Sequence, residues 1–281
     1  MKEIGISEVQ EIALDILLYI DKICREHEIK YSVFYGSLIG IERHKGFIPW
    51  DDDIDIVLLR SEYERLMEIL KVQDNNYTLL EFKTRETYRY PFAKVVDTRT
   101  SVKTKQLFNG EEKDLGVFVD IFPLDTIPKN QAEQKRHHDI VEKYRLNMMD
   151  SLKLCYARSY SKIKSCIKLI VRFPRHLSLI QKGGYKYWRN LYETTAQKYS
   201  AGDSNYCGYM EFTDIDWGVF PKSWFEDVED VSFKGHSVMA IKARREFLEL
   251  RYGDYMKMPP IEERKTHHPY IFYKVNNCSE N

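Results

Sequence analysis

The sequence is poor in cysteine, and its few thiols do not form pairs. Among 281 residues there are five cysteines, an odd number, and no two of them stand in a C-x-x-C arrangement. A disulfide framework or a structural zinc site would need paired or closely spaced thiols, so neither is expected. The thiols are interpreted as buried or incidental residues in a reducing compartment.

Long apolar runs are also missing. The stretch from Ile12 to Ile20 is interrupted by Asp15, and no stretch reaches the roughly 18 to 20 apolar residues of a membrane span. The N-terminus does not show the charged-then-apolar order of a signal peptide. We therefore expect a cytoplasmic protein.

Net charge is absent overall, but the charges are unevenly placed. Lysine plus arginine equals aspartate plus glutamate, yet residues 151–192 contain ten positive charges and no acid. Ile163, Ile167 and Ile170 recur there at helical spacing. Such a basic amphipathic helix is either a solvated face, a holder for a lipid-linked glycan acceptor, or a peripheral contact with the inner face of the cell membrane. The charge balance and the acidic cluster described below disfavour nucleic-acid binding.

The order of predicted elements indicates an α+β fold with a mixed β-sheet flanked by helices. Ser7 and Gln10 read as a capping box for a helix that ends near His27. Ser61 is expected to cap a second helix, and Pro123 to close a strand. Strands are predicted at 31–35, 53–58, 77–82, 92–96 and 117–121, and helices at 61–70, through much of 131–199, and at 242–251.

Three parts follow from this order. Residues 1–130 are expected to form a catalytic core, and residues 131–200 a basic helical subdomain divided at Pro174 and at Gly183-Gly184. Residues 201–281 are expected to be a mixed segment that packs back on the core.

An acidic run, Asp51-Asp52-Asp53-Ile54-Asp55, stands directly before apolar residues that must be buried. On a strand, Asp53 and Asp55 would share one face, about 6 to 7 Å apart, and would repel each other without a cation between them. Their hard oxygen ligands suit Mg²⁺, or alternatively Mn²⁺. Asp51 shares their parity, whereas Asp52 is expected to face elsewhere and to matter least. The competing interpretation is a solvated acidic turn, which the buried neighbours disfavour.

Two further features bear on this site. Gly36-Ser37 opens a short helix, where glycine and helix-start amides let the backbone approach a phosphate. Asp120 lies in an apolar strand and needs a partner. It is interpreted as a third carboxylate beside the pair, or as a buried acid bonded to an amide or a lysine.

Several other side chains are candidates for substrate binding. Arg43 and Lys45 flank the loop before the acids and either clamp phosphates or lie on the surface. Lys94 lies on a predicted strand and is a candidate phosphate ligand. Trp50 would stack on a base, join an aromatic cage for a quaternary ammonium, or anchor its loop in the core.

These motifs together resemble the LicD family, which includes phosphocholine transferases and the fukutin-related ribitol-phosphate transferases. The match runs through Gly36-Ser37-Leu38-Ile39-Gly40 and the block from Arg43 to Asp55. It continues through Val119 to Asp125, Tyr252 to Pro260 and the pair His267-His268. The resemblance implies a nucleotidyltransferase-like fold.

The resemblance also implies a reaction. Members of the family transfer an alcohol phosphate from a CDP-alcohol, with CDP-choline the leading donor here, to a sugar hydroxyl of a cell-surface glycan, and release CMP. By the motif match, Asp53, Asp55 and Asp120 would hold Mg²⁺. Asp120, Asp51 or Asp125 would accept the proton of the attacking hydroxyl. The alternatives are a nucleotidyltransferase that releases pyrophosphate, or a catalytically silent nucleotide-binding protein.

Overall fold

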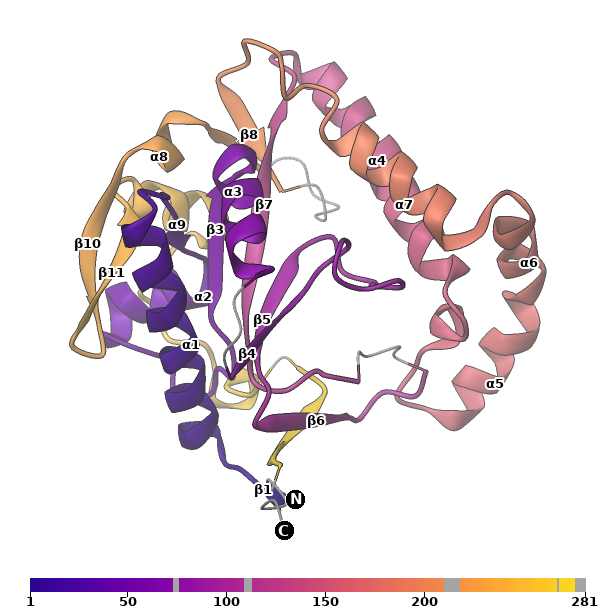
Figure 1. Ribbon diagram of the computed structural model, residues 1–281, viewed down its shortest axis with the longest axis horizontal. Helices are drawn as coiled ribbons and strands as arrows, with labels where there is room; N and C mark the ends of the chain where they lie inside the picture. Colours follow the sequence, from indigo (N-terminus) through magenta and orange to yellow (C-terminus); the bar gives the residue numbers. More distant parts are fainter. Residues whose placement is uncertain (73–75, 109–112, 210–217, 267, 276–281) are drawn as a thin grey trace.

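A mixed β-sheet lies at the centre of the computed structural model, which describes residues 1–72, 76–108, 113–209, 218–266 and 268–275 (Figure 1). β3 runs parallel to β7, whereas the other neighbours pair antiparallel. Two short strands extend the sheet along the far end of β7. The expected mixed sheet flanked by helices is thus confirmed. The strands, in order across the sheet and then its extension, are β2 (Ser32–Val33), β3 (Asp55–Leu59), β7 (Phe118–Ile127), β5 (Ala93–Asp97), β4 (Tyr77–Leu80), β8 (Tyr206–Gly208) and β9 (Val219–Pro221).

The central strand β7 is longer than predicted. It spans ten residues, all buried, and does not end before Pro123. The amide of Asp120 points to β3, so by alternation position 123 faces the other side. On that side β5 pairs only as far as Ile121, and β8 begins pairing at Asp125. A backbone N–H at position 123 would therefore have no strand partner, so β7 tolerates a proline there.

Two helices, α1 (Ile6–Glu26) and α3 (Arg60–Leu70), pack against the sheet. The predicted capping box is wrong, because α1 begins at Ile6 with Gly5 as its N-cap. Ser61 likewise lies inside α3, because β3 runs directly into this helix. β2 is also shorter than predicted, since the chain turns into α2 (Tyr35–Ile39) and the π-helical turn η1 (Gly40–His44).

A helical arm extends to one side of the sheet (Figure 1). It consists of α4 (Gln131–Ser151), the turn η2 (Cys155–Ala157), α5 (Lys162–Val171), α6 (Phe173–Gln181) and α7 (Gly184–Ala196). The predicted breaks are confirmed, since Pro174 lies in the first turn of α6 and Gly183 precedes α7. The hydroxyl of Tyr185 accepts a hydrogen bond from the backbone N–H of Tyr88 and donates one to its carbonyl, which ties the arm to the segment between β4 and β5.

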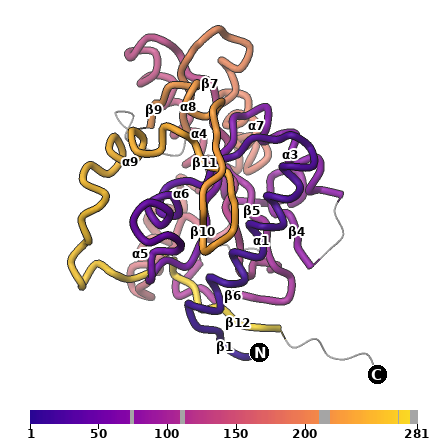
Figure 2. Tube along the Cα trace, turned by 90° about the vertical axis from the view of Figure 1, so that its left-hand side faces the viewer, coloured from indigo at the N-terminus to yellow at the C-terminus, as the bar shows by residue number. Residues whose placement is uncertain are grey.

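The C-terminal part returns to the core. Figure 2 shows the hairpin of β10 (Val228–Phe233) and β11 (His236–Ile241) and the path that leads from α9 to the last strand. β11 lies against β2, and β12 (Tyr270–Lys274) pairs with β1 (Lys2–Glu3) and β6 (Thr100–Thr104). The remaining elements are α8 (Ser223–Glu226), α9 (Arg244–Tyr252), which stops at Gly253 as predicted, and η3 (Ile261–Glu263). No helix among the described residues combines the length and the apolarity that crossing a membrane demands.

Candidate active site

A row of charged side chains crosses three neighbouring strands. Asp55 of β3 lies opposite Asp120 of β7, which in turn lies opposite Lys94 of β5. Residues directly opposite each other project from the same face of a sheet. The Lys94 ammonium donates to Asp120 Oδ1 at 2.5 Å, and both side chains are buried. Asp120 is therefore a lysine-bonded buried acid and also stands beside the predicted carboxylate pair.

Asp53, Asp55 and Asp120 come together as a cluster of carboxylates. One oxygen from each lies within 4.8 Å of the others. Burial, followed by the negative charges of Asp53 and Asp120, raises the pKa of Asp55 well above its usual range. Burial also raises the pKa of Asp120 to about 6, against the opposing effect of Lys94. Three crowded carboxylates, two of which have a raised pKa, fit a hard divalent cation, which would offset their repulsion.

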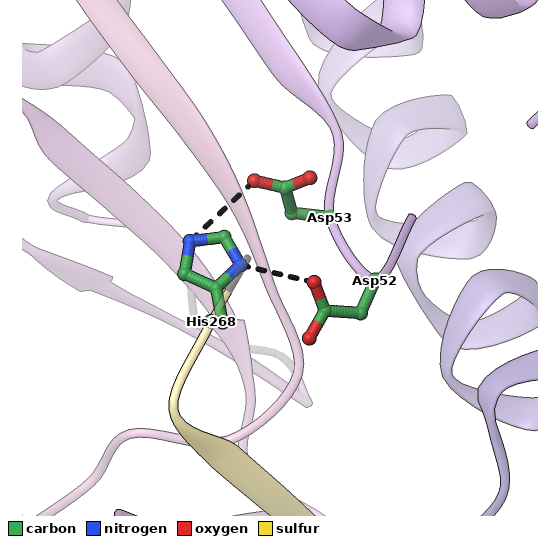
Figure 3. A group of neighbouring side chains, drawn as sticks. All are labelled: Asp52, Asp53 and His268. Carbon is green, nitrogen blue, oxygen red and sulfur yellow. Dashed lines mark hydrogen bonds and ion pairs between the residues drawn. The ribbon is translucent and has the colours of Figure 1, made fainter. Parts of the chain in front are cut away.

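The acidic run does not follow the alternation of a strand. β3 begins only at Asp55, so Asp52 and Asp53 lie in the loop before it. Both side chains reach His268 (Figure 3), which bonds Asp52 Oδ1 through Nδ1 at 3.0 Å and has Nε2 3.6 Å from Asp53 Oδ2. The expectation that Asp52 faces elsewhere is wrong, because this buried carboxylate holds the histidine beside the cluster. The expectation that Asp52 matters least for activity stays a prediction.

His268 is a site residue whose position could not be predicted from the sequence. Burial opposes its protonation, but Asp53 and Asp52 outweigh burial and raise its pKa to about 9. Its ring stacks on Tyr270 with centroids 5.4 Å apart, and the pairing of β12 with β6 fixes that strand. The only signal was the histidine pair of the family motif, and His267 lies outside the described residues. His268 thus adds positive charge beside the acids.

The acidic loop is anchored by a side chain from α1. Gln10, buried, donates from Nε2 to the carbonyls of Ile48 at 3.1 Å and Asp51 at 2.8 Å. A Cβ at Gly36 would stand 2.8 Å from Asp51 Oδ2, so glycine allows this close approach. The Ser37 Oγ atom accepts a hydrogen bond of 3.0 Å from the backbone N–H of Asp55 and thereby fixes the start of β3. Ser37 therefore positions the acids, and Gly36 lines the cavity above them.

Asp51 lies in the same cavity but outside the close cluster of three. Burial, followed by the charge of Asp53, raises the pKa of Asp51 to about 8. A carboxylate with such a pKa can take up a proton near neutral pH. Asp51 is therefore a candidate for accepting a proton in this cavity.

The carboxylates line a cavity of about 460 Å³ with largely aromatic walls. The Phe122 and Tyr209 rings meet edge to face at 4.9 Å between centroids, and Tyr35 meets Phe122 at 5.8 Å. The sequence did not point to these rings, because they come from three separate segments: α2, β7 and the residue after β8. The other aromatic residues of the lining are Trp50, Tyr90, Phe92 and Tyr252.

A second hollow of about 260 Å³ adjoins the first and shares Asp120 and His268 with it. Its walls include three cationic side chains, Lys94, Arg89 and Arg158. Burial, followed by the nearby charge of Arg89, lowers the pKa of Arg158. Two guanidinium groups and an ammonium around one hollow suit an anion such as phosphate.

Three of the remaining candidates lie away from this cavity. Arg43 donates to the carbonyls of Tyr255 at 2.8 Å and Lys257 at 3.1 Å, and Lys45 donates to that of Glu42. Asp125 accepts two bonds of 2.7 Å from Arg60.

Trp50 does line the cavity, and Arg264 lies 5.6 Å from its ring centroid. The structure thus brings Gly36, Trp50 and Lys94 to the two hollows. Arg43 and Lys45 do not line either hollow and instead donate hydrogen bonds to backbone carbonyls.

Comparison with known proteins adds an independent line of evidence. Residues 28–148 match the family model described as LicD/FKTN/FKRP, nucleotidyltransferase domain. The chain is 30% identical over 278 residues to the lipopolysaccharide cholinephosphotransferase LicD of Haemophilus influenzae, covering 95% of this chain and 97% of the relative. Shorter matches, of 32% identity over 71 residues and 42% over 45, link it to uncharacterised proteins of Rickettsia typhi and Rickettsia prowazekii.

Proposed function

The chain belongs to the LicD family of transferases, and we propose that it moves phosphocholine from CDP-choline to a sugar hydroxyl, with release of CMP. The observation that carries this proposal is the cluster of Asp53, Asp55 and Asp120 inside an aromatic cavity. In the reaction, the hydroxyl oxygen bonds the phosphorus that carries choline. The bond from that phosphorus to the oxygen of CMP breaks.

Asp53, Asp55 and Asp120 are the residues that would hold Mg²⁺ or Mn²⁺. A bound divalent cation supplies positive charge that neutralises the donor diphosphate and stabilises the departing CMP. Lys94 holds Asp120 in place, and Ser37 holds the start of β3 that carries Asp55. These contacts support a preformed cluster.

Asp51 is proposed as the group that accepts the proton of the attacking hydroxyl. Asp120 is bonded to Lys94 and Asp125 is bonded to Arg60. Asp51 lines the cavity with a raised pKa and is held at its backbone by Gln10. Proton transfer to such a group contributes about 10² to 10⁴ in rate.

The cationic hollow supports a substrate that carries phosphate. Arg89, Lys94 and Arg158 would receive an anionic oxygen beside the carboxylate cluster. Two guanidinium groups bind phosphate oxygens in fixed geometry.

Choline is favoured as the transferred alcohol by the ring arrangement. A quaternary ammonium is attracted to aromatic faces within about 6 Å. Tyr35, Phe122 and Tyr209 line one part of the cavity. The nearby Phe118 ring already has a cation over it, because Lys94 Nζ lies 3.6 Å from its centroid. We propose the first three rings as the choline contact.

The acceptor is proposed to be a precursor of lipopolysaccharide or teichoic acid. The relative from Haemophilus influenzae is named for lipopolysaccharide, which supports the first of these. A sugar hydroxyl of either precursor would supply the attacking oxygen.

A donor panel tests this function. The purified chain is incubated with Mg²⁺ and CDP-choline, CDP-ribitol, CDP-glycerol or CDP-ethanolamine, and the CMP released by transfer to water, which takes the place of the sugar hydroxyl, is quantified. Release of CMP from CDP-choline in preference to the others is expected. Release of pyrophosphate from a nucleoside triphosphate, without CMP from any donor, would instead identify a nucleotidyltransferase.

A further inference from the structure

The short helix α5 carries its apolar side chains on the outside. Ile163, Ile167, Ile170 and Val171 are 74%, 55%, 77% and 71% exposed. Their spacing places them on one face, since residues four and seven apart lie above one another in a helix. The one buried residue of α5 is Ser165. A surface helix normally buries its apolar stripe, so this helix has the reverse orientation.

The next helix continues the pattern. Phe173, Leu177 and Ile180 of α6 again recur at intervals of four and three residues and are 46%, 41% and 46% exposed. α6 follows α5 after a single residue, and Figure 1 places both at the outer end of the helical arm. Seven exposed apolar side chains therefore come from one stretch of 18 residues.

Positive charge accompanies this apolar face. Residues 151–192 contain no acid, and Lys162, Lys164 and Lys182 are exposed and form no ion pair within the described part of the chain. Arg172 and Arg175 share Asp150 of α4. These two arginines tie the start of α6 to α4, while the three lysines leave charge at the surface.

We propose that the outer face of α5 and α6 binds the surface of a bilayer that contains anionic lipid. Apolar side chains would enter the boundary between headgroups and acyl chains, and the lysines would meet anionic headgroups. A second copy of the chain is disfavoured as the occupant, because it would bring the same cations face to face. Helices of ten and nine residues lie on a bilayer, since a span needs about 20.

Vesicle co-sedimentation of the full chain tests this surface. The probes are vesicles of phosphatidylcholine alone and of equal parts phosphatidylcholine and phosphatidylglycerol. We expect binding to the mixed vesicles and a fall of at least about tenfold in the partition coefficient for the variant I163S/I167S/I170S. K162Q/K164Q/K182Q should lose several-fold and no longer distinguish the two vesicles. All six side chains are surface residues, so both variants should fold.

A matched control is available in η3. Ile261 is 78% exposed, as Ile170 is 77% exposed. Ile170→Ser should weaken vesicle binding, and Ile261→Ser should leave it unchanged. Equal binding by the wild type and the triple serine variant would overturn the proposal, as would absence of binding to the mixed vesicles. If light scattering showed a wild-type dimer that I163S/I167S/I170S does not form, the face would be assigned to a second copy of the chain instead. No donor is needed, so this result is independent of the proposed transfer.

Discussion

At the scale of single residues, the acids of the site are unequal although they are close in sequence. Asp53 and Asp55 join Asp120, Asp52 holds His268, and Asp51 remains beside them with a pKa raised to about 8. The difference arises from the partner that each carboxylate finds in the fold. Each acid should therefore give a different phenotype when it is replaced.

Asp51→Asn should slow transfer and change its pH dependence. If Asp51 accepts the proton, kcat should fall by about 10² to 10⁴. The wild-type rate should rise with pH along a limb whose midpoint is at or below about 8, since a bound cation lowers this pKa. The limb should vanish in Asp51→Asn and persist in Asp52→Asn. A variant D51N that keeps both the rate and the limb would remove Asp51 from this role.

Tyr209→Leu should weaken selection of choline. Loss of one cation–π contact costs about 0.5 to 2 kcal/mol, or about 2-fold to 30-fold in kcat/KM for CDP-choline. CDP-ribitol, which lacks the positive charge, should be less affected. Phe220→Leu removes a buried ring outside the cavity and serves as control. Equal losses for both donors would show that Tyr209 only shapes the cavity.

At the scale of elements, the site depends on how neighbouring segments fix one loop. β3 and β7 set the spacing of Asp55 and Asp120 through parallel pairing, and α1 holds the acidic loop through Gln10. The loop before β3 has no strand ladder, so this glutamine supplies two of its backbone contacts. Its loss should loosen Asp51 and Asp53.

Gln10→Ala should lower metal affinity and kcat/KM, each by about tenfold, because two loop carbonyls lose their partner. Gln134 is the matched control, since it is also a buried glutamine that donates to a carbonyl, that of Pro128, at 2.8 Å. Gln134→Ala should cost similar stability and leave metal affinity intact. Isothermal titration with Mn²⁺ measures the affinity. Equal affinities in the two variants would contradict the anchoring role.

Local patterns predicted much of this fold, and distant contacts account for the rest. Neighbouring residues determine three features that the sequence predicted and the structure contains. These are the apolar run of β3, the Gly36-Ser37 turn and the helix breaks at Pro174 and Gly183. Gln10 and His268 reach the acids across 41 and 216 positions, which no local pattern encodes. The prediction from strand alternation of where the Asp52 side chain points was wrong, because β3 begins three residues later, at Asp55.

At the scale of the whole molecule, segments from along the chain meet at one carboxylate cluster. α1 supplies Gln10, the sheet supplies Asp55, Asp120 and Lys94, and the segment before β12 supplies His268. The arm contributes Arg158 to the adjoining hollow. Charge at this junction should therefore influence the stability of the entire fold.

The metal-free protein should lose stability as pH rises from 6 to 8. The pKa values of Asp55 and Asp51 are raised, and that of His268 is raised to about 9, so the folded state holds protons that the unfolded state releases. Asp55→Asn should raise the melting temperature in EDTA at pH 8, by about 2 to 4 °C per kcal/mol. Mg²⁺ should then stabilise the wild type but not this variant. A lower melting temperature for Asp55→Asn in EDTA would contradict this electrostatic account.

The central claim is that Asp53 and Asp55 form the metal centre of a CDP-choline transferase. The decisive measurement is CMP release from CDP-choline with Mg²⁺ by the wild type and by D53N/D55N, with folding checked by circular dichroism. The control D203N/D227N replaces two exposed acids that make surface ion pairs. The account predicts no turnover above background in D53N/D55N and unchanged turnover in the control. A folded D53N/D55N variant that releases CMP at the wild-type rate would contradict it.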